Sequence, residues 1–243
     1  MRRKNDFIKH LKSLGRWREL RRWYRYHFPI ETDFFDGKTR LTKRGVHRVF
    51  NVWLKSEEAA RESAASYQAY EGGDFIDVGA YEGFYSLLLA PKARAGAKFL
   101  AMEPDNRFFS KLLMYLGEAK NLFPHIQFYP LPLACGDGSA ASVNCTSGIT
   151  TLETICVDSL VDTLRMTPTF IKIDVEGLEY SVLKGMQKTL SNFKPTIMLE
   201  LHPKYLPQGV SAQDVDAFLR NQGYTSADID ITELTWRQLW KQN

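Results

Sequence analysis

The sequence has few cysteines and no long apolar run. Its three cysteines, Cys135, Cys145 and Cys156, include no Cys-x-x-Cys pair, so we expect reduced structural thiols rather than a disulfide framework or a zinc knuckle. Every uninterrupted apolar segment is far shorter than the roughly 18 residues that a membrane-spanning helix needs. These absences exclude a disulfide-stapled domain and an integral membrane protein.

The composition is that of a globular protein with an unusual charge distribution. The 243 residues are 44% hydrophobic and 25% charged, which fits one domain with an extension. Residues 1–50 hold 15 Lys and Arg against 5 Asp and Glu, a net charge of +10, whereas residues 51–243 hold 17 against 23, a net charge of −6, and the two sum to the +4 of the whole chain. We therefore expect a basic helical N-terminal extension over residues 1–70 and a catalytic or binding domain over residues 71–243.

Residues 5–27 have apolar residues at three- and four-residue spacings among many Arg and Lys residues, which predicts a basic amphipathic helix. Such a helix could pack on the domain, attach to an anionic membrane or a lipid-linked substrate, or bind nucleic acid. Because Lys9, His10 and Lys12 interrupt any apolar leader, we predict a cytoplasmic protein, with peripheral contact at the inner membrane face as one alternative. Residues 29–45 are expected to form a loop region with a short hairpin, and residues 46–70 favour a helix.

From Gly72 onward, short apolar runs alternate with helical patterns, which is typical of βαβ units around a mainly parallel sheet. The piece from Gly136 to Leu152 and on through Thr154 to Val161 is expected to be a loop or small hairpin. The predicted strands are Phe75 to Val78, Lys98 to Met102, Ile126 to Tyr129, Phe170 to Asp174 and Thr196 to Leu201, and the predicted helices are Tyr81 to Ala93, Asn106 to Ala119, Leu178 to Asn192 and Ala212 to Asn221.

The first of these strands runs through a glycine turn into a helix, as in nucleotide-type cofactor sites. Gly79 permits a tight turn, and Gly83 permits close packing of the helix. Asp77 and Glu82 make the turn acidic, which disfavours a pyrophosphate and suits the cationic sulfonium and ammonium groups of S-adenosylmethionine. Glu103 ends the next strand, where a carboxylate can accept two hydrogen bonds from a ribose diol.

A second cluster follows the fourth and fifth strands. Asp174 and Glu176 should face the same crevice as the glycine turn, because ligands bind at the carboxyl ends of parallel strands. Lys172 lies within an apolar strand and needs a partner, for which we predict Glu200 in a structural ion pair. His202 ends the fifth strand, and it is either a catalytic or substrate-binding residue or a structural histidine.

These residues resemble a known family. The segments DVGAYEGFYS, LAMEP, IKIDVEGLEYSVLKG and IMLELH are similar to the FkbM family of S-adenosylmethionine-dependent methyltransferases, over roughly Asp74 to Tyr224. The resemblance implies an α/β, Rossmann-like class I methyltransferase sandwich that methylates a hydroxyl of a sugar, glycolipid or polyketide-like acceptor. It implies that the cofactor is bound by Asp77, Gly79, Ala80, Gly83, Glu103 and, at the adenine, Asp137.

The sequence departs from the family pattern at two places. Tyr81 stands where an asparagine is common, which affects only the detail of the cofactor contacts. The usual fold ends in two strands, but here Ile229 to Leu234 can supply only one, and the stretch from Trp236 to Trp240 looks helical. The sequence therefore does not decide how this edge of the sheet is built.

Methyl transfer to a hydroxyl needs orientation of both reactants and a base for the proton. The candidates for the catalytic groups are Asp174, Glu176 and His202. Asp174 and Glu176 could instead bind a divalent cation, but the spacing of two carboxylates is too common to be diagnostic, so we assign no metal ligand. Two alternatives stay open: a cofactor-binding relative without turnover, and a nucleic-acid methyltransferase that uses the basic arm, which the acidic cleft disfavours. The residues predict neither the acceptor nor the oligomeric state.

Overall fold

The computed structural model describes residues 30–31, 40–41 and 57–242. Contacts between Cα atoms divide the chain into two compact units, residues 1–52 and 53–243. In the first unit, β1 (Ile30–Glu31) and β2 (Arg40–Leu41) pair antiparallel, within the region where a short hairpin was expected. The predicted helix over residues 5–27 lies outside the described residues.

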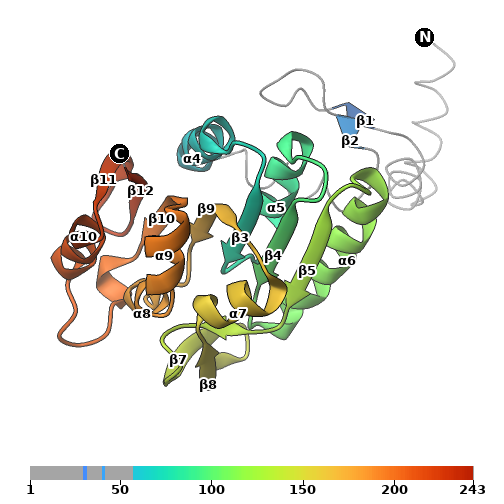
Figure 1. Ribbon diagram of the computed structural model, residues 1–243. Helices are drawn as coiled ribbons and strands as arrows, with labels where there is room; N and C mark the ends of the chain where they lie inside the picture. The colour runs from blue at the N-terminus through green and yellow to red at the C-terminus, as the bar shows by residue number, and fades with distance from the viewer. Residues whose placement is uncertain (1–29, 32–39, 42–56, 243) are drawn as a thin grey trace, which may run out of the picture. The chain divides into compact units, whose positions relative to one another are not determined.

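The second unit is built on a seven-stranded sheet with the order β11-β12-β10-β9-β3-β4-β5. Neighbouring strands are parallel from β10 to β5, whereas β12 runs antiparallel to both β10 and β11 (Figure 1). The strands are β3 (Asp74–Val78), β4 (Lys98–Met102), β5 (Gln127–Leu131), β9 (Pro168–Ile173), β10 (Thr196–Leu201), β11 (Tyr224–Ile231) and β12 (Trp236–Gln242). All five predicted strands are therefore present, within one or two residues of the expected bounds.

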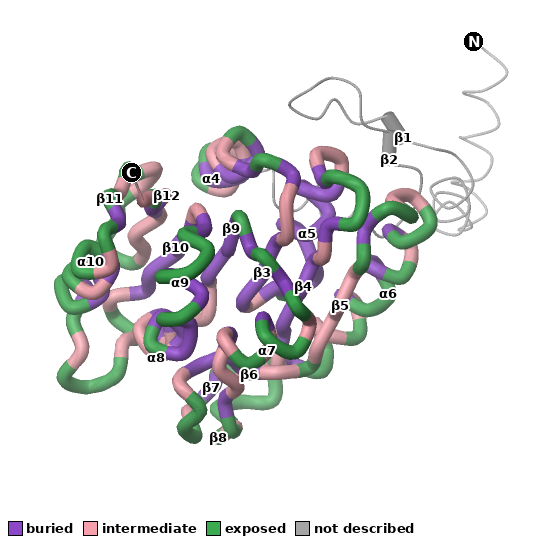
Figure 2. Tube along the Cα trace, viewed as in Figure 1, coloured by how far each residue is buried: buried purple, intermediate pink, exposed green. Residues whose placement is uncertain are grey.

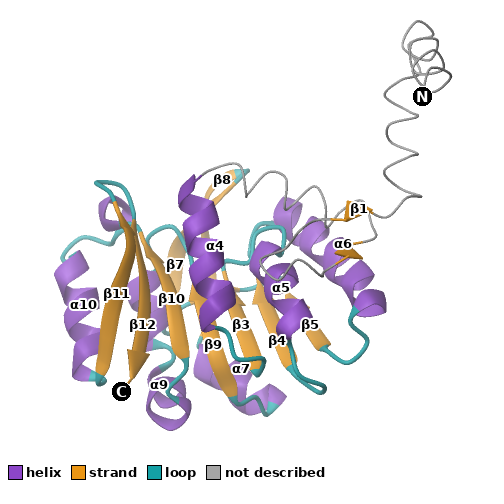
Figure 3. Ribbon diagram, turned by 90° about the horizontal axis from the view of Figure 1, so that it is seen from above, coloured by secondary structure: helices purple, strands orange, loops and turns teal. Residues whose placement is uncertain are grey.

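The helices cover the two faces of this sheet, as the predicted class I methyltransferase sandwich requires. Figure 3 shows α4 lying across one face. The predicted helix from Leu178 to Asn192 is divided at Gly185 and Met186, and α7 was not predicted. The helices are α4 (Glu57–Ala69), α5 (Phe84–Leu89), α6 (Asn106–Leu122), α7 (Val157–Leu164), α8 (Glu179–Lys184), α9 (Gln187–Phe193) and α10 (Ala212–Asn221), with 3₁₀ turns at Ala90–Lys92 and Pro203–Tyr205. Helix α4 was expected in the N-terminal extension, but it belongs to the second unit.

Alternate residues of the strands point to opposite faces and form two cores. On one face, Ile76, Ile171 and Leu199 are buried with apolar side chains of α7 to α10. On the other face, the rings of Phe75, Phe99 and Phe170 lie with their centroids 6.0–6.3 Å from that of Tyr70. Phe75 also contacts Phe99 and Phe170, at 5.3 and 5.9 Å. The inner strands are consequently buried along their length (Figure 2).

The C-terminal edge corrects a sequence-based prediction. The stretch from Trp236 to Trp240 was expected to be helical, but it forms β12. A spacing of four residues fits one turn of a helix and equally two periods of a strand, so the two tryptophans alone are ambiguous. In the fold, both contact the same hydrophobic core, and Trp240 is fully buried. The two terminal strands of the usual fold are thus both present.

A small sheet lies beside the main one and includes the expected hairpin. Strands β7 (Ala140–Cys145) and β8 (Gly148–Ile155) pair antiparallel, and the short β6 (Ala134–Cys135) pairs parallel with β8. In the turn between β7 and β8, the Thr146 backbone amide donates to the Asp105 carboxylate. This bond ties the hairpin to the loop that follows β4. Among the described residues, no helix is both long and apolar enough to cross a bilayer.

Candidate active site

The glycine turn after β3 brings three strands together. Gly79 has a φ of +81°, and its amide and that of Ala80 donate to the Met102 carbonyl of β4 at 3.0 and 2.9 Å. A Cβ at Gly79 would lie 1.8 Å from the Asp174 carbonyl oxygen, so only glycine allows the turns after β3 and β9 to approach this closely. Gly83, with a φ of +88°, begins α5 against Leu112 of α6.

A pocket opens at the carboxyl ends of β3, β4 and β9. Its wall includes two of the residues predicted to bind the cofactor and two of those predicted to be catalytic. The lining residues are Val78, Gly79, Glu103, Pro104, Leu133, Ala134, Cys135, Val143, Asn144, Asp174, Val175, Glu176 and Leu178. Residues predicted to bind the cofactor and residues predicted to be catalytic therefore line the same pocket.

Glu103 is fixed at the pocket wall by the backbone. One carboxylate oxygen accepts from the Tyr81 amide at 2.9 Å, and the other accepts from the Asp105 amide at 2.8 Å. Burial raises the pKa of Glu103, and these two amide bonds oppose that rise. Each oxygen keeps a further lone pair, so the carboxylate can still accept from a ligand diol as predicted.

Asp77 lies beneath the turn and does not line the pocket. It is 1% exposed and accepts from the Ser86 hydroxyl at 2.9 Å and the Ser86 amide at 3.2 Å. Burial raises its pKa to about 6, although the Ser86 hydrogen bonds and Lys172 act against this. Asp77 therefore holds the start of α5 in place under the turn. Glu82, the other acidic residue of the turn, pairs with Lys111.

Asp137 was predicted to contact adenine, but its carboxylate is engaged elsewhere. It accepts from the Lys184 ammonium and the Ser139 hydroxyl, both at 2.5 Å, and these donors hold its pKa below the usual range. Asp137 is not among the residues that line the pocket. Cys135 and Leu133, in the segment before it, do line the pocket.

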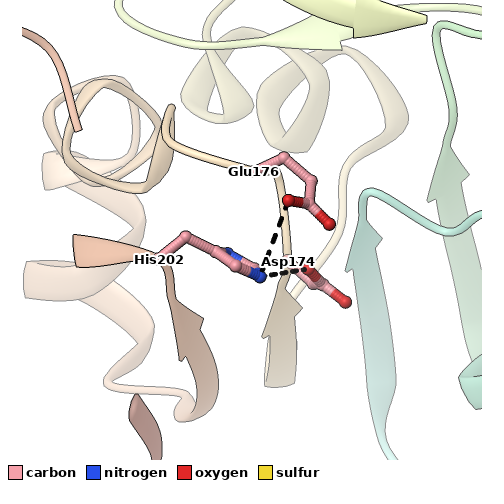
Figure 4. A group of neighbouring side chains, drawn as sticks. All are labelled: Asp174, Glu176 and His202. Carbon is pink, nitrogen blue, oxygen red and sulfur yellow. Dashed lines mark ion pairs between the residues drawn. The ribbon is translucent and has the colours of Figure 1, made fainter. Parts of the chain in front are cut away.

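The three predicted catalytic residues come together (Figure 4), and two of them, Asp174 and Glu176, line the pocket. His202 Nε2 lies 4.0 Å from Asp174 Oδ1 and 3.8 Å from Glu176 Oε2. Glu176 is in the left-handed region with a φ of +53°, and Gly177 follows with a φ of +110°. A Cβ at Gly177 would lie 2.2 Å from the Tyr205 carbonyl oxygen, so this turn packs directly on the segment after His202.

The surroundings of His202 and Asp174 shift the pKa values of these two residues. Burial lowers the pKa of His202, whereas the hydrogen bond to Glu179 and the carboxylates of Asp174 and Glu176 raise it. The raising effects are larger, so the pKa of His202 is above its ordinary value. Burial also raises the pKa of Asp174, and the neighbouring Glu200 carboxylate adds to this while Lys172 opposes it. Perturbed groups in a cleft are typical of catalytic sites.

Lys172 supports the cluster from below. Its ammonium is 2.9 Å from Glu62 of α4, 3.5 Å from the predicted partner Glu200, and 3.6 Å from Asp174. Arg237 of β12 pairs with both Glu62 and Glu200. The predicted pair of Lys172 and Glu200 is confirmed. Glu62 was not predictable, because a helical glutamate in an Ala- and Glu-rich stretch looks like a solvent-exposed one.

The same cluster offers a set of ligand atoms. One atom each of Asp174, Glu176 and His202 lies within 4.8 Å of the others, a set that could hold a divalent cation. Glu179, which is fully buried and contacts His202, was not among the predicted site residues. Its place in the IKIDVEGLE segment, two residues after a glycine turn, was the available signal.

Two comparisons with known proteins bear on the family of this chain. A family model described as the methyltransferase FkbM domain matches residues 77–226. A hexuronic acid methyltransferase, AglP, from Haloferax volcanii is 30% identical over 204 residues, covering 79% of this chain and 80% of that protein.

Two solved structures share the fold. A methyltransferase FkbM from Methylobacillus flagellatus is 16% identical with a TM-score of 0.52, and the match covers 81% of this chain but only 58% of that one. An O-methyltransferase from Klebsiella pneumoniae, described as putative, is 12% identical with a TM-score of 0.51, covering 84% of this chain and 92% of that one.

Proposed function

The chain belongs to the FkbM methyltransferase family, and from this premise we propose that it methylates a hydroxyl oxygen of a sugar acceptor, with hexuronic acids as the first class to test. Methyl transfer and the cofactor S-adenosylmethionine follow from the family and its fold. The choice of oxygen and of a sugar is the proposed part.

The pocket residues fit S-adenosylmethionine. Gly79 leaves room for close approach to the backbone. A dinucleotide with its phosphates would favour basic side chains, but none of the described residues that line the pocket is basic. Glu103 would accept from the ribose hydroxyls, and the nearby carboxylates of Asp174 and Glu176 would favour the cationic groups. When bound, this cofactor supplies a methyl group on an electron-poor sulfonium.

The observation that carries the proposal is the meeting of His202 with Asp174 and Glu176, the two carboxylates that line that pocket together with Glu103. His202 Nε2 can take the proton of an acceptor hydroxyl as the oxygen forms its bond to the methyl carbon. The electrons of the breaking carbon–sulfur bond stay on sulfur, and the proton later passes from His202 to water. Asp174 and Glu176 stabilise the protonated imidazole and orient the acceptor.

A sugar acceptor is supported by the hexuronic acid methyltransferase, whose match covers most of both chains. Glycolipid and polyketide-like acceptors are the other classes that the resemblance implies. The basic residues 5–27 lie outside the described structure, and we keep peripheral binding to an anionic membrane as a proposal for them. The acidic cleft speaks against a nucleic-acid acceptor.

The test combines cofactor binding with product analysis. The purified chain is titrated calorimetrically with S-adenosylmethionine, and is then incubated with it and hexuronic acid glycosides whose products are located by NMR. We expect cofactor binding that weakens by about 1.5–3 kcal/mol in Glu103→Ala, as for a hydrogen bond to a charged group. The exposed Glu58→Gln serves as a control that keeps wild-type affinity.

The products formed with the acceptors test whether a sugar hydroxyl is methylated. A methyl ether on a sugar hydroxyl, lost in His202→Ala, supports the proposal. A methyl ester on the hexuronic acid carboxylate would contradict O-methylation of a hydroxyl. Cofactor binding without transfer to any acceptor would favour a relative that does not turn over. Since we assign no metal, activity should persist in excess chelator.

A further inference from the structure

Glu179 contacts His202 at Nδ1, whereas the other ring nitrogen, Nε2, faces Asp174 and Glu176. Glu179 is the first residue of α8, and its side chain is fully buried. One carboxylate oxygen lies 2.9 Å from His202 Nδ1 and accepts from the Gly177 amide at 3.0 Å. The other oxygen is buried and has no hydrogen-bond partner among the described residues.

This contact determines how the imidazole presents its two nitrogens. An ionised carboxylate only accepts, so a neutral His202 must carry its proton on Nδ1 to bond with Glu179. Nε2 is then left with a free lone pair. Figure 4 shows that Nε2 faces Asp174 and Glu176, at distances too long for hydrogen bonds. The lone pair is thus available to a ligand bound beside these two carboxylates.

Burying a glutamate in this way is costly unless a cation compensates it. No lysine or arginine pairs with Glu179 in the described part of the chain, and the partner in reach is His202. A protonated imidazole formed during the reaction would supply the missing positive charge. The cost of burial is then offset at the moment when His202 holds the acceptor proton.

We propose that Glu179 is a positioning residue that holds His202 with Nδ1 protonated and Nε2 free toward the acceptor, and that stabilises the imidazolium. The same carboxylate anchors the Gly177 amide, so it fixes the Glu176 turn and the histidine together. This inference rests on the proposed function for its catalytic meaning, but the geometry of the imidazole can be tested without any acceptor.

The first measurement is a long-range ¹H–¹⁵N NMR spectrum of the full chain labelled with ¹⁵N-histidine, at alkaline pH where the imidazole is neutral. The His202 signal is identified by its absence in His202→Gln. We expect the Nδ1–H form in the wild type and a mixture of both forms in Glu179→Ala. The Nε2–H form in the wild type would overturn the proposal, and this readout does not depend on folding of the Glu179 variants.

The second measurement separates kcat from KM with an acceptor that the chain methylates. Glu179→Ala should lower kcat by about 100-fold or more, within the range that a positioned base contributes, while KM for S-adenosylmethionine changes little. Glu179→Gln keeps an acceptor atom but no charge, so its kcat should lie between those of the wild type and Glu179→Ala.

A matched control is Glu58→Gln, an exposed glutamate in the first turn of α4, which should leave kcat unchanged. Unchanged kcat in Glu179→Ala would overturn the proposal, as would a loss confined to KM. If no acceptor is methylated but the Nδ1–H form is found, the positioning contact stands and the proposed function fails.

Discussion

At the scale of single residues, Asp77 shows how burial makes stability depend on pH. Its pKa in the fold is about 6, against an ordinary value of 3.8, because burial penalises the ionised form. The folded state therefore holds the proton more tightly than the unfolded chain. The stabilisation from protonated Asp77 is fully present below its unfolded pKa and is lost as the pH rises through about 6.

Asp77→Asn should remove this loss, because the amide cannot ionise. We compare the free energy of unfolding of the variant with that of the wild type at each pH. This difference should shift in favour of the variant by about 2–3 kcal/mol between pH ~4 and pH ~8, because the pKa of Asp77 is shifted by about two units. Urea unfolding of both proteins at the two pH values measures this. An equal difference in free energy of unfolding at both would contradict the assignment.

Gly79 and Gly96 form a matched pair for testing close approach of the backbone. Both have positive φ values, +81° and +85°, but a Cβ at Gly79 would meet the Asp174 carbonyl, whereas nothing lies within 4 Å at Gly96. Gly96→Ala should cost about 1–2 kcal/mol, the strain of the left-handed region alone. Gly79→Ala should cost clearly more and weaken cofactor binding, as measured by thermal unfolding and calorimetry. Equal losses would contradict the packing argument.

At the scale of elements, the buried charges join α4 to the sheet. Lys172 of β9 contacts Glu62 of α4 and Glu200 of β10, and Arg237 of β12 contacts the same two glutamates. This network joins α4, β9, β10 and β12 next to Asp174. It also explains why α4 belongs to the domain, although its sequence has only a weak apolar pattern.

Lys172→Met would leave those carboxylates buried with one fewer cation. We expect a loss of about 3–5 kcal/mol in the free energy of unfolding, the range for breaking a buried ion pair on one side. The loss should shrink at acid pH, where the carboxylates become protonated. Urea unfolding measures it, with the exposed Lys120→Met as the control. A loss no larger than that of the control would show that the network adds nothing to stability.

Elements also show where local pattern is ambiguous. The glycine turn and the five parallel strands were predictable, because alternating short apolar runs and turn residues are local signals. Helix α7 was missed because Val157 to Leu164 follows a Gly-, Ser- and Thr-rich stretch and offers only two turns. The last strand was missed because its two tryptophans fit both periods.

At the scale of the whole molecule, the charge asymmetry separates the first 50 residues from the domain. Within the described part of the chain, the residues that line the pocket all fall between Val78 and Leu178. Deleting residues 1–28 should therefore leave the affinity for S-adenosylmethionine unchanged, as measured by calorimetry. Sedimentation with anionic liposomes tests the membrane proposal in the same pair of proteins. Equal liposome affinity of the two would contradict membrane binding through this segment.

The sequence by itself determined the five parallel strands, the glycine turn and the three candidate catalytic residues. These follow from local periodicity and from the rule that the carboxyl ends of parallel strands meet at one edge. The tertiary structure decided which atoms meet across that edge. Three such contacts join segments distant in sequence: Glu179 with His202, Glu62 with Lys172, and Lys184 with Asp137. Only the packing of helices on the sheet sets such distances, because no local pattern encodes which buried charges become neighbours.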